Sequence, residues 1–420
     1  MQLIRIAWRN IWRSRVRSLV VILAVALGLW AGVFMLAFSW GINSQRMQNI
    51  IETKISHVQV HAPEFRDEKE VGKFISETQS QQLLGDLSAD ERVKAVASRL
   101  VLTGMAQSPR AGLGVQINAI APEAEAALTQ LPERLIAGKY LEKDGRAMRI
   151  LIGAKLMEKL GLTKEEGDST IYGIRKSVVL KFQDTQGQTQ GVKFKVQGVF
   201  KSQDSRFDAS NVYVRMDDLA QYAGVGEGRH QIALLFNDPQ TAEDSTYLQA
   251  LRAEHADLEI ENWKEIAPDL KLVDESFSVT VTIFMSVILL ALLFGIVNTM
   301  MMAILERTRE LGMLMAVGMN RARVFGMIML ETFFLTMVGA PIGLLAAYGS
   351  VSYFGNVGID ISAFAEGTAQ FGVSSVVYTS LESGYYLQIT LMVAVTALIA
   401  AIFPARRALR LNPAEAVRAI

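Results

Sequence analysis

Four continuous apolar stretches dominate the pattern of hydrophobic and polar positions along the chain. They cover residues 19–40, 277–305, 324–354 and 385–405, and Glu331 is the one charged residue inside them. At 1.5 Å per residue, each stretch is long enough to cross the ~30 Å hydrocarbon core of a bilayer as a helix. The pattern therefore predicts four membrane-spanning helices.

Between the first two stretches, residues 41–276 follow a different pattern. Short runs alternate between apolar and polar positions, as half-buried strands do, and segments with a helical repeat lie between them. The runs predicted as strands are 56–61, 114–120, 177–182, 192–200 and 232–236. The segments predicted as helices are 76–87, 123–131, 154–160 and 241–254, with 269–276 as a helical stalk that joins the second span. We expect an α+β domain here.

Residues 1–18 have a helical repeat of their own. Apolar and tryptophan side chains recur at helical spacing, while Arg5, Arg9 and Arg13 repeat every four residues. This pattern predicts an amphipathic helix in the headgroup layer. The alternative is that these residues are only the charged start of the first span. Because that span is longer than a usual signal-peptide core and lacks a cleavage site, we expect an uncleaved anchor.

Charges beside the apolar stretches predict the orientation. Arginines gather in residues 1–18, in the loop 306–323 and in the tail 406–420, whereas the loop 355–384 has acids and no base. Loops rich in Lys and Arg stay in the cytoplasm. Both chain ends and the loop 306–323 are therefore expected there, with residues 41–276 on the other side.

Composition then narrows the functional classes. The 420 residues include 42 basic and 42 acidic side chains, so no basic surplus points to nucleic acid. The absence of cysteine excludes disulfides, thiol catalysis and zinc–thiolate sites. Neither Gly72-Lys73 nor Gly138-Lys139 is followed by the Ser or Thr of a phosphate loop. We expect no catalytic residue, metal or cofactor in this chain.

Two other features have competing interpretations. His57 and His61 would lie on one face of a strand, but no third ligand is near in sequence, which favours a solvated strand face over a metal site. Glu331 is predicted to lie near the inner membrane surface, paired with Arg321 or Arg323. A proton or substrate role for this carboxylate is the alternative.

The loop after the second span carries the most specific motif. It reads Leu305-Glu306-Arg307-Thr308-Arg309-Glu310-Leu311-Gly312-Met313-Leu314-Met315-Ala316-Val317-Gly318-Met319. A helix here that exposes Leu311, Met315 and Val317 could dock in a groove on a cytoplasmic partner. This string closely resembles the E-R-T-R-E-I-G segment of the FtsX/MacB/LolC family of ABC transporter permeases. The chain's ending, 404–418, is similar to that family's tail, with Val417 in place of the usual Leu. Residues 151–168, 196–200 and 211–214 resemble the family's external core.

This resemblance implies an α-helical membrane protein with four transmembrane helices and a large α+β periplasmic domain of the MacB/LolC type. It implies a bacterial inner-membrane permease, paired with an identical or related permease, and a separate P-loop ATPase that binds ATP and magnesium. In the family, the loop after the second span holds the helix that contacts the ATPase. That role carries over to Glu306, Arg307, Arg309, Glu310, Leu311, Gly312, Met315 and Gly318.

Within the family, the segment after the first span looks more like LolC and LolE than MacB. Those relatives release lipoproteins from the inner membrane to a periplasmic carrier. The alternatives are MacB-like efflux of peptides or macrolides with an adaptor, and FtsX-like regulation of an external hydrolase. A membrane-bound enzyme is a more distant alternative. We expect a lipoprotein or lipid-like substrate in a cavity between paired protomers, lined by Leu29, Val33, Leu36, Phe284, Ile288 and Leu292.

Overall fold

The computed structural model describes residues 2–13, 15–142, 147–166, 169–364, 367 and 372–409. The chain forms two compact units. Met1–Ser44, Val273–Ile361 and Val376–Ile420 make up the first, which we call the membrane unit. Gln45–Leu272 and Ser362–Ser375 make up the second, the α/β unit. The tail motif from residue 410 onward and the pair at 167–168 lie outside the described residues.

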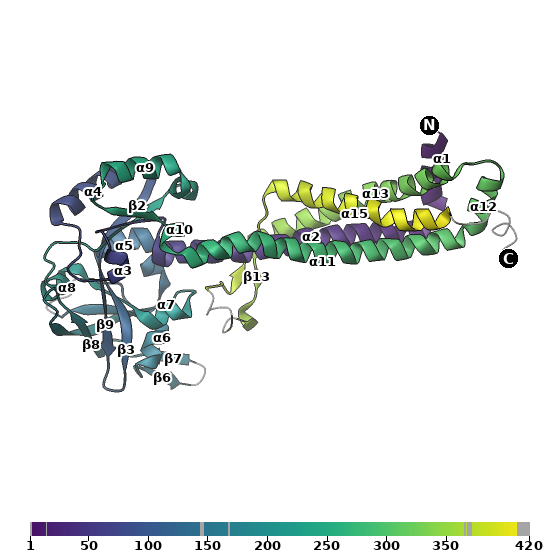
Figure 1. The fold of residues 1–420 in the computed structure, drawn as a ribbon. Helices are drawn as coiled ribbons and strands as arrows, with labels where there is room; N and C mark the ends of the chain where they lie inside the picture. The colour runs from purple at the N-terminus through teal and green to yellow at the C-terminus, as the bar shows by residue number, and fades with distance from the viewer. Residues whose placement is uncertain are drawn as a thin grey trace. The chain divides into compact units, whose positions relative to one another are not determined.

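Long helices build the membrane unit (Figure 1). They are α1 (Gln2–Arg13), α2 (Arg15–Ile50), α11 (Pro268–Glu306), α12 (Thr308–Ala316), α13 (Arg321–Val357) and α15 (Ser383–Ala408). Within the described residues, four helical segments are long and apolar enough to cross a membrane: Ser18–Ile55, Pro268–Glu306, Arg321–Val357 and Ser383–Ala408. The prediction of four spans is confirmed. Because α11 begins at Pro268, the predicted stalk and the second span are one helix.

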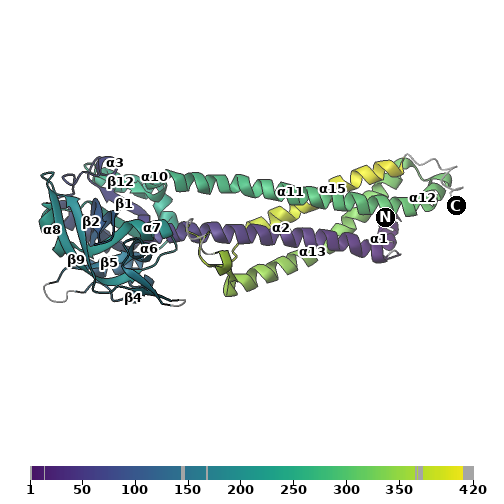
Figure 2. The same cartoon turned by 90° about the horizontal axis from the view of Figure 1, so that it is seen from below.

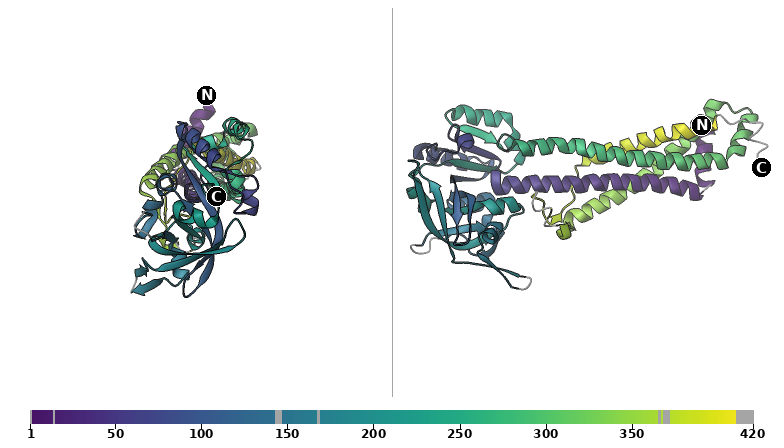
Figure 3. Two further views of the ribbon diagram at one scale, coloured as in Figure 1. Left: turned by 90° about the vertical axis from the view of Figure 1, so that its left-hand side faces the viewer. Right: turned by 60° about the horizontal axis from the view of Figure 1, so that its bottom comes forward.

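Small residues let α13 approach α2 closely. A Cβ added at Gly343 would come within 2.6 Å of the carbonyl oxygen of Ala26, and one added at Gly339 within 2.9 Å of that of Ile22. Small residues at these positions allow tight packing between helices in lipid. On its other side, α2 packs against α11, so that the two helices run side by side (Figure 3, right; purple and green).

The N-terminal residues form a helix separate from the first span. The side-chain hydroxyl of Ser18 donates a hydrogen bond of 2.5 Å to the carbonyl oxygen of Ile11, whereas residues seven apart in an unbroken helix are about 10 Å apart along its axis. The chain therefore bends between α1 and α2, and residues 1–18 are not merely the charged start of that span. Ile11 joins the core of the helix bundle. Trp8 stacks edge-on against Phe334 of α13, with 5.5 Å between the ring centroids. Part of the apolar face of α1 therefore packs on the protein itself.

One large sheet organises the α/β unit, and Figure 2 labels several of its strands. Its strands are β1 (Val58–His61), β2 (Val93–Gln107), β3 (Gly112–Ile120), β4 (Leu135–Gly138), β5 (Arg149–Gly153), β8 (Ser177–Gln183), β9 (Thr189–Phe200), β10 (Asn211–Arg215), β11 (Gln231–Phe236) and β12 (Glu259–Asn262). Among the described residues the order is β12-β1-β11-β2-β3-β10-β5-β9-β4, and β8 pairs with both β2 and β9. That double pairing closes the ring β2-β3-β10-β5-β9-β8.

Two short hairpins and a set of helices complete the described elements. The hairpins are β6 (Thr163–Glu166) with β7 (Ser169–Tyr172), and β13 (Ile359–Asp360) with β14 (Val376–Val377). The helices are η1 (Ile51–Ile55), α3 (Phe65–Glu68), α4 (Glu77–Ala89), α5 (Pro122–Thr129), η2 (Leu131–Arg134), α6 (Ala154–Lys159), α7 (Ser205–Ser210), α8 (Met216–Ala223), η3 (Pro239–Glu243), α9 (Ser245–Glu254), α10 (Trp263–Ile266) and η4 (Ser362–Phe364).

The long strand β2 links two hydrophobic cores. Leu100 and Leu102 belong to the core inside the closed ring, with Phe194 of β9. Ala97, near the other end of β2, belongs to a second core formed around β1, β11 and the helices α4 and α9. The unit therefore has two lobes that share one strand, which fits the predicted α+β class.

A buried ion pair joins strand β2 of the sheet to helix α5. The guanidinium of Arg99 on β2 donates two hydrogen bonds, of 2.9 and 2.8 Å, to the two carboxylate oxygens of Glu125 on α5. The side chains are 5% and 0% exposed. A paired geometry of this kind is what makes burial of two charges tolerable.

Candidate functional site: the helix between the second and third spans

A short separate helix, α12, occupies the loop that carries the sequence motif. α11 ends at Glu306, and Arg307 leaves the helical conformation, with φ −105° and ψ 14°. The next span starts after Asn320, whose side-chain oxygen accepts a hydrogen bond of 2.8 Å from the backbone N–H of Arg323. This cap fixes where α13 begins, so α12 is set off from both spans.

The end of α12 depends on a glycine. Gly318 has a φ of +104°, a backbone conformation that side chains with a Cβ rarely adopt. Its N–H donates to the carbonyl of Met315 at 3.1 Å, and the N–H of Met319 donates to that of Leu314 at 3.0 Å. These two bonds form a Schellman motif, which satisfies the last carbonyls of the helix.

We expect Gly318→Ala to loosen the end of α12 by about 1–2 kcal/mol, because alanine is strained at this φ. Amide hydrogen exchange of α12 in the full-length chain measures the effect as faster exchange. Gly326→Ala is the matched control, since neither glycine has another atom within 4 Å of an added Cβ and Gly326 has no positive φ. Equal exchange in both variants would contradict the role given to Gly318.

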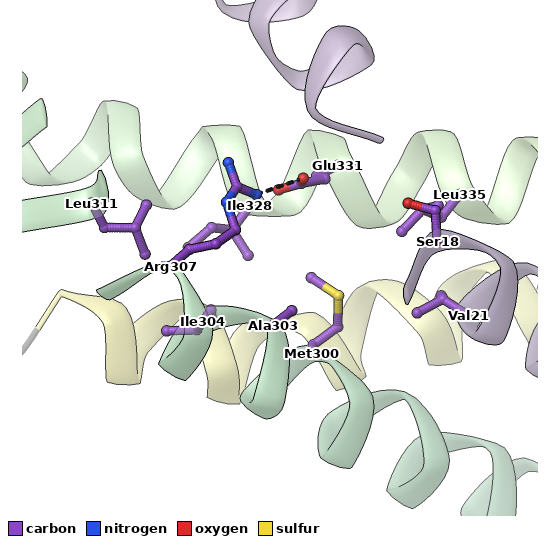
Figure 4. Close-up of a pocket in the computed structure, with 10 residues that line it drawn as sticks. All are labelled: Ser18, Val21, Met300, Ala303, Ile304, Arg307, Leu311, Ile328, Glu331 and Leu335. Atoms are coloured by element: carbon purple, nitrogen blue, oxygen red, sulfur yellow. Dashed lines mark hydrogen bonds and ion pairs between the residues drawn. The ribbon is translucent and has the colours of Figure 1, made fainter. Parts of the chain in front are cut away.

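An ion pair joins α12 to the third span (Figure 4). The Nη1 atom of Arg307 lies 2.9 Å from Oε1 of Glu331, and its Nε lies 3.1 Å from Oε2 of Glu310. The predicted partners of Glu331, Arg321 and Arg323, are therefore wrong. They precede Glu331 on the same helix by ten and eight residues, which corresponds to about 15 and 12 Å along the axis.

A small cavity of about 20 Å³ lies beside this ion pair. That volume is close to the room needed for one water molecule. Its lining residues are Ser18, Val21, Met300, Ala303, Ile304, Arg307, Leu311, Ile328, Glu331 and Leu335 (Figure 4). It is too small for a lipid or peptide substrate.

The two faces of α12 differ in exposure. Leu311, at 3% exposed, and the adjacent Gly312 are turned into the helix bundle. Arg309, Met313 and Val317 follow each other at intervals of four residues and are all exposed, Val317 to 90%. Residues four apart lie on one face of a helix. The exposed face is therefore Arg309, Met313 and Val317, which we call the outer stripe.

The structure distributes the eight predicted coupling residues over both faces. Leu311 and Gly312 are buried, so Leu311 is not the exposed docking side chain that the sequence suggested. Arg307, Glu310 and Met315 are partly buried. Glu306, Arg309 and Gly318 are exposed. Of the three side chains predicted to be exposed for docking, Val317 is exposed, Met315 is partly buried and Leu311 is buried. Met313 is absent from the predictions, because the sequence does not show which apolar side of so short a helix faces inward.

The six residues predicted to line a substrate cavity are also divided. Leu29, Val33, Leu36 and Leu292 are buried in the core of the helix bundle within this single chain. Phe284 is 49% exposed and Ile288 is half-buried on α11. Of this set, only these last two side chains are open to a second molecule.

Three histidines of the α/β unit, His57, His61 and His230, are buried, so the predicted solvated strand face is wrong. His57 and His61 are 7% and 3% exposed. The Nδ1 of His57 accepts a hydrogen bond of 2.9 Å from the backbone N–H of Phe236. Burial lowers the pKa of His57 and His230, and lowers that of His61 to about 4. These histidines are therefore neutral parts of the core at pH 7.

Neutral buried histidines predict a loss of stability in acid. The unfolded chain takes up a proton on His61 near its ordinary pKa of 6.5, and the folded chain takes it up only near 4. Stability is therefore full above pH 6.5 and falls towards pH 4, by roughly 3 kcal/mol for this residue.

Burial also raises the pKa of Asp208 to about 6, which acts in the opposite direction, so the informative quantity is the difference between variants. His61→Gln should flatten the fall in thermal stability between pH 6.5 and 4, measured on the full-length chain in detergent. An unchanged pH dependence would contradict the assignment of His61 as a neutral core group.

Comparison with protein families gives two matches. Residues 18–246, more than half of the chain, match the MacB-like periplasmic core domain. Residues 282–413 match the FtsX-like permease C-terminal family, and this segment contains α12.

Several curated proteins are similar to the chain. The ABC transporter permease YvrN of Bacillus subtilis, described as uncharacterized, is 24% identical over 82% of this chain and 86% of its own length. The lipoprotein-releasing system transmembrane protein LolC of Neisseria meningitidis is 23% identical over 73% of each chain. The macrolide export ATP-binding/permease protein MacB of Chlorobium luteolum is 30% identical over 30% of this chain and 16% of its own.

Among solved structures, the periplasmic region of MacB from Actinobacillus actinomycetemcomitans is similar, with 14% identity and a TM-score of 0.36. The match covers 54% of this chain and 97% of that one.

Proposed function

The chain belongs to the FtsX/MacB/LolC family of ABC transporter permeases, and from this premise we propose that it couples ATP hydrolysis by a partner ATPase to work outside the membrane. In this proposal the chain is non-catalytic, and the partner binds ATP and magnesium. The chain lies in a bacterial inner membrane, with both ends and α12 in the cytoplasm and the α/β unit outside.

The outer stripe is the surface that meets the ATPase. Val317 and Met313 offer an apolar contact, and Arg309 adds a charge beside them. The Arg307–Glu331 ion pair and the buried Leu311 fix α12 to the bundle on its opposite face. A movement imposed on α12 therefore reaches α13 directly, while α11 adjoins α12 through the single residue Arg307.

α11 is the span on which we place the contact with a second permease. Only 17% of its apolar window is buried inside the chain, against 28% to 44% for the other three spans. Its exposed side chains include Ile283, Phe284, Val287 and Phe294. A paired copy or a related permease would cover this face, and acyl chains of a substrate would fit between the two.

Release of lipoproteins from the membrane is the function we favour. The observation that carries it is the likeness to LolC, which extends over 73% of both chains and so includes the spans and the external unit. In proteoliposomes that contain the chain with its ATPase and an acylated lipoprotein, ATP should cause release of the lipoprotein to a soluble carrier. ATP hydrolysis without release would contradict this function.

MacB-like export is the second candidate, because the match to the MacB-like periplasmic core domain spans residues 18–246. It predicts that a periplasmic adaptor copurifies and that peptide or macrolide substrates stimulate ATP turnover. Copurification of a cell-wall hydrolase instead would indicate an FtsX-like regulator.

A further inference from the structure

One face of the large sheet carries polar side chains where a hydrophobic layer is usual. Cross-strand partners point to the same side of a sheet. The register pairs His61 with Gln231, Gln231 with Arg99, and Thr103 with Gln116. It also pairs Gln116 with Asn211, and Asn118 with Tyr213. Five neighbouring strands, β1, β11, β2, β3 and β10, thus present imidazole, amide, hydroxyl and guanidinium groups together, opposite the apolar core of the closed ring.

This polar face is the floor of a cleft of about 230 Å³ within the α/β unit. The lining residues are Lys54, Ile55, Gln59, His61, Phe65, Arg66, Lys69, Arg99, Val101, Thr103, Gln116, Asn118, Phe207, Asn211, Tyr213, Gln231 and Ile266. They include four cationic side chains and no carboxylate.

Two of the four cations lack an acidic partner. Arg66 pairs with Glu261 at 2.9 Å, and Arg99 pairs with Glu125. Lys54 and Lys69 are exposed, and neither side chain makes an ion pair with any residue that the structure describes. At the mouth of the cleft, two cations thus stand without an ion-pair partner in a concave site, where an anion can bind them.

Floor groups have hydrogen-bonding capacity left for a ligand. Gln116 donates to Asn118 at 3.0 Å, and Asn118 donates to Asn211 at 3.2 Å, so this amide row is held in place. Within the described part of the chain, the hydroxyls of Tyr213 and Thr103 have no hydrogen-bond partner. Amide side chains held in place beside hydroxyls that have no partner can form hydrogen bonds with a ligand that has several polar groups.

We propose that this cleft binds a small polar molecule that carries an oxyanion, phosphate or carboxylate. Lys54 and Lys69 bind the oxyanion. The side chains of Gln116, Asn118 and Tyr213, on the floor of the cleft, form hydrogen bonds with the remaining polar groups of the ligand. The volume is below the ~300–1,000 Å³ of sites that enclose drug-sized ligands, so a head group or a terminal group fits. The inference goes beyond the proposed function, because binding here requires neither ATP nor the ATPase.

Some residues that line the cleft are close in sequence to the first two spans. Lys54 and Ile55 are the last two residues of η1, the helix that directly follows α2. Ile266 ends α10, two residues before α11 starts at Pro268. A bound molecule would thus touch the segments of the α/β unit that follow α2 and precede α11 in the chain.

Calorimetric titration of the full-length chain in an uncharged maltoside detergent tests the proposal. The probes are glycerol 3-phosphate and succinate, with glycerol as the uncharged control. We expect saturable binding of one molecule of at least one anion per chain, weakened by added salt, and no binding of glycerol. Binding of glycerol 3-phosphate alone would indicate a phosphate-bearing ligand, and binding of succinate alone a carboxylate.

The variant K54M/K69M should raise the Kd at least tenfold, while the matched control K193M/K195M, on the exposed side of β9, should leave it unchanged. Gln116→Leu, an exposed floor position, should also weaken binding without unfolding the chain. Absence of binding for both anions, or wild-type affinity in K54M/K69M, would overturn the proposal.

Discussion

Val317→Asp should lower ATP turnover by the complex of permease and ATPase at least tenfold while the permease stays folded. Val317 is 90% exposed at the end of the outer stripe, so the chain itself loses no packing. A carboxylate there would have to be desolvated without a partner when an apolar surface docks on it. ATP hydrolysis in reconstituted membranes, together with copurification of the ATPase, measures the effect.

Two variants make this result interpretable. Ile136→Asp places the same charge on an exposed apolar side chain of the α/β unit and should leave ATP turnover unchanged. Leu311→Ala removes a buried side chain and should cost about 2–5 kcal/mol of stability, because it leaves a cavity beneath α12. Normal turnover and normal binding of the ATPase in Val317→Asp would mean that the outer stripe is not the docking face.

Glu125→Ala should lower the free energy of unfolding of the α/β unit by about 3–5 kcal/mol. The substitution leaves the guanidinium of Arg99 charged and buried, with 5% of its side chain exposed and its two carboxylate contacts gone. Denaturant unfolding of the full-length chain in detergent gives the value. It is followed by fluorescence in a background where the four tryptophans of the membrane unit are replaced by Phe, so that the buried Trp263 is the reporter.

The double variant Arg99→Met with Glu125→Leu is the control for this prediction. It removes both charges and keeps similar volumes, so it should regain most of the stability lost in the single variant. If the single and double variants are equally unstable, the loss comes from packing and not from an unpaired charge.

Long apolar stretches made the four spans predictable from sequence, because a bilayer imposes both length and composition on a helix. The alternating runs likewise indicated strands such as β9. The helix predicted over 241–254 is instead divided into η3 and α9, because the side chain of Asp244 caps a new helix by accepting from Thr246 at 2.9 Å. A side-chain hydrogen bond that ends one helix and caps the next leaves no mark on the hydrophobic periodicity of the sequence.

The candidate site was less predictable than the fold. The motif located α12, but the inward face of a nine-residue helix depends on what it packs against, and so Leu311 was assigned to the wrong side. The partner of Glu331 comes from the turn before α12, which only the three-dimensional packing brings near. The polar cleft depends on strand register between segments more than 100 residues apart, such as Gln116 and Gln231.

Mass spectrometry of the complex, purified from its host in mild detergent, tests the central claim most directly. We predict that a P-loop ATPase copurifies with the chain, together with acylated N-terminal cysteine peptides from a lipoprotein. The same purification with Val317→Asp should lose the ATPase, and with Ile136→Asp it should keep it. A wild-type complex without any ATPase would contradict the account of this chain as an ATP-coupled permease.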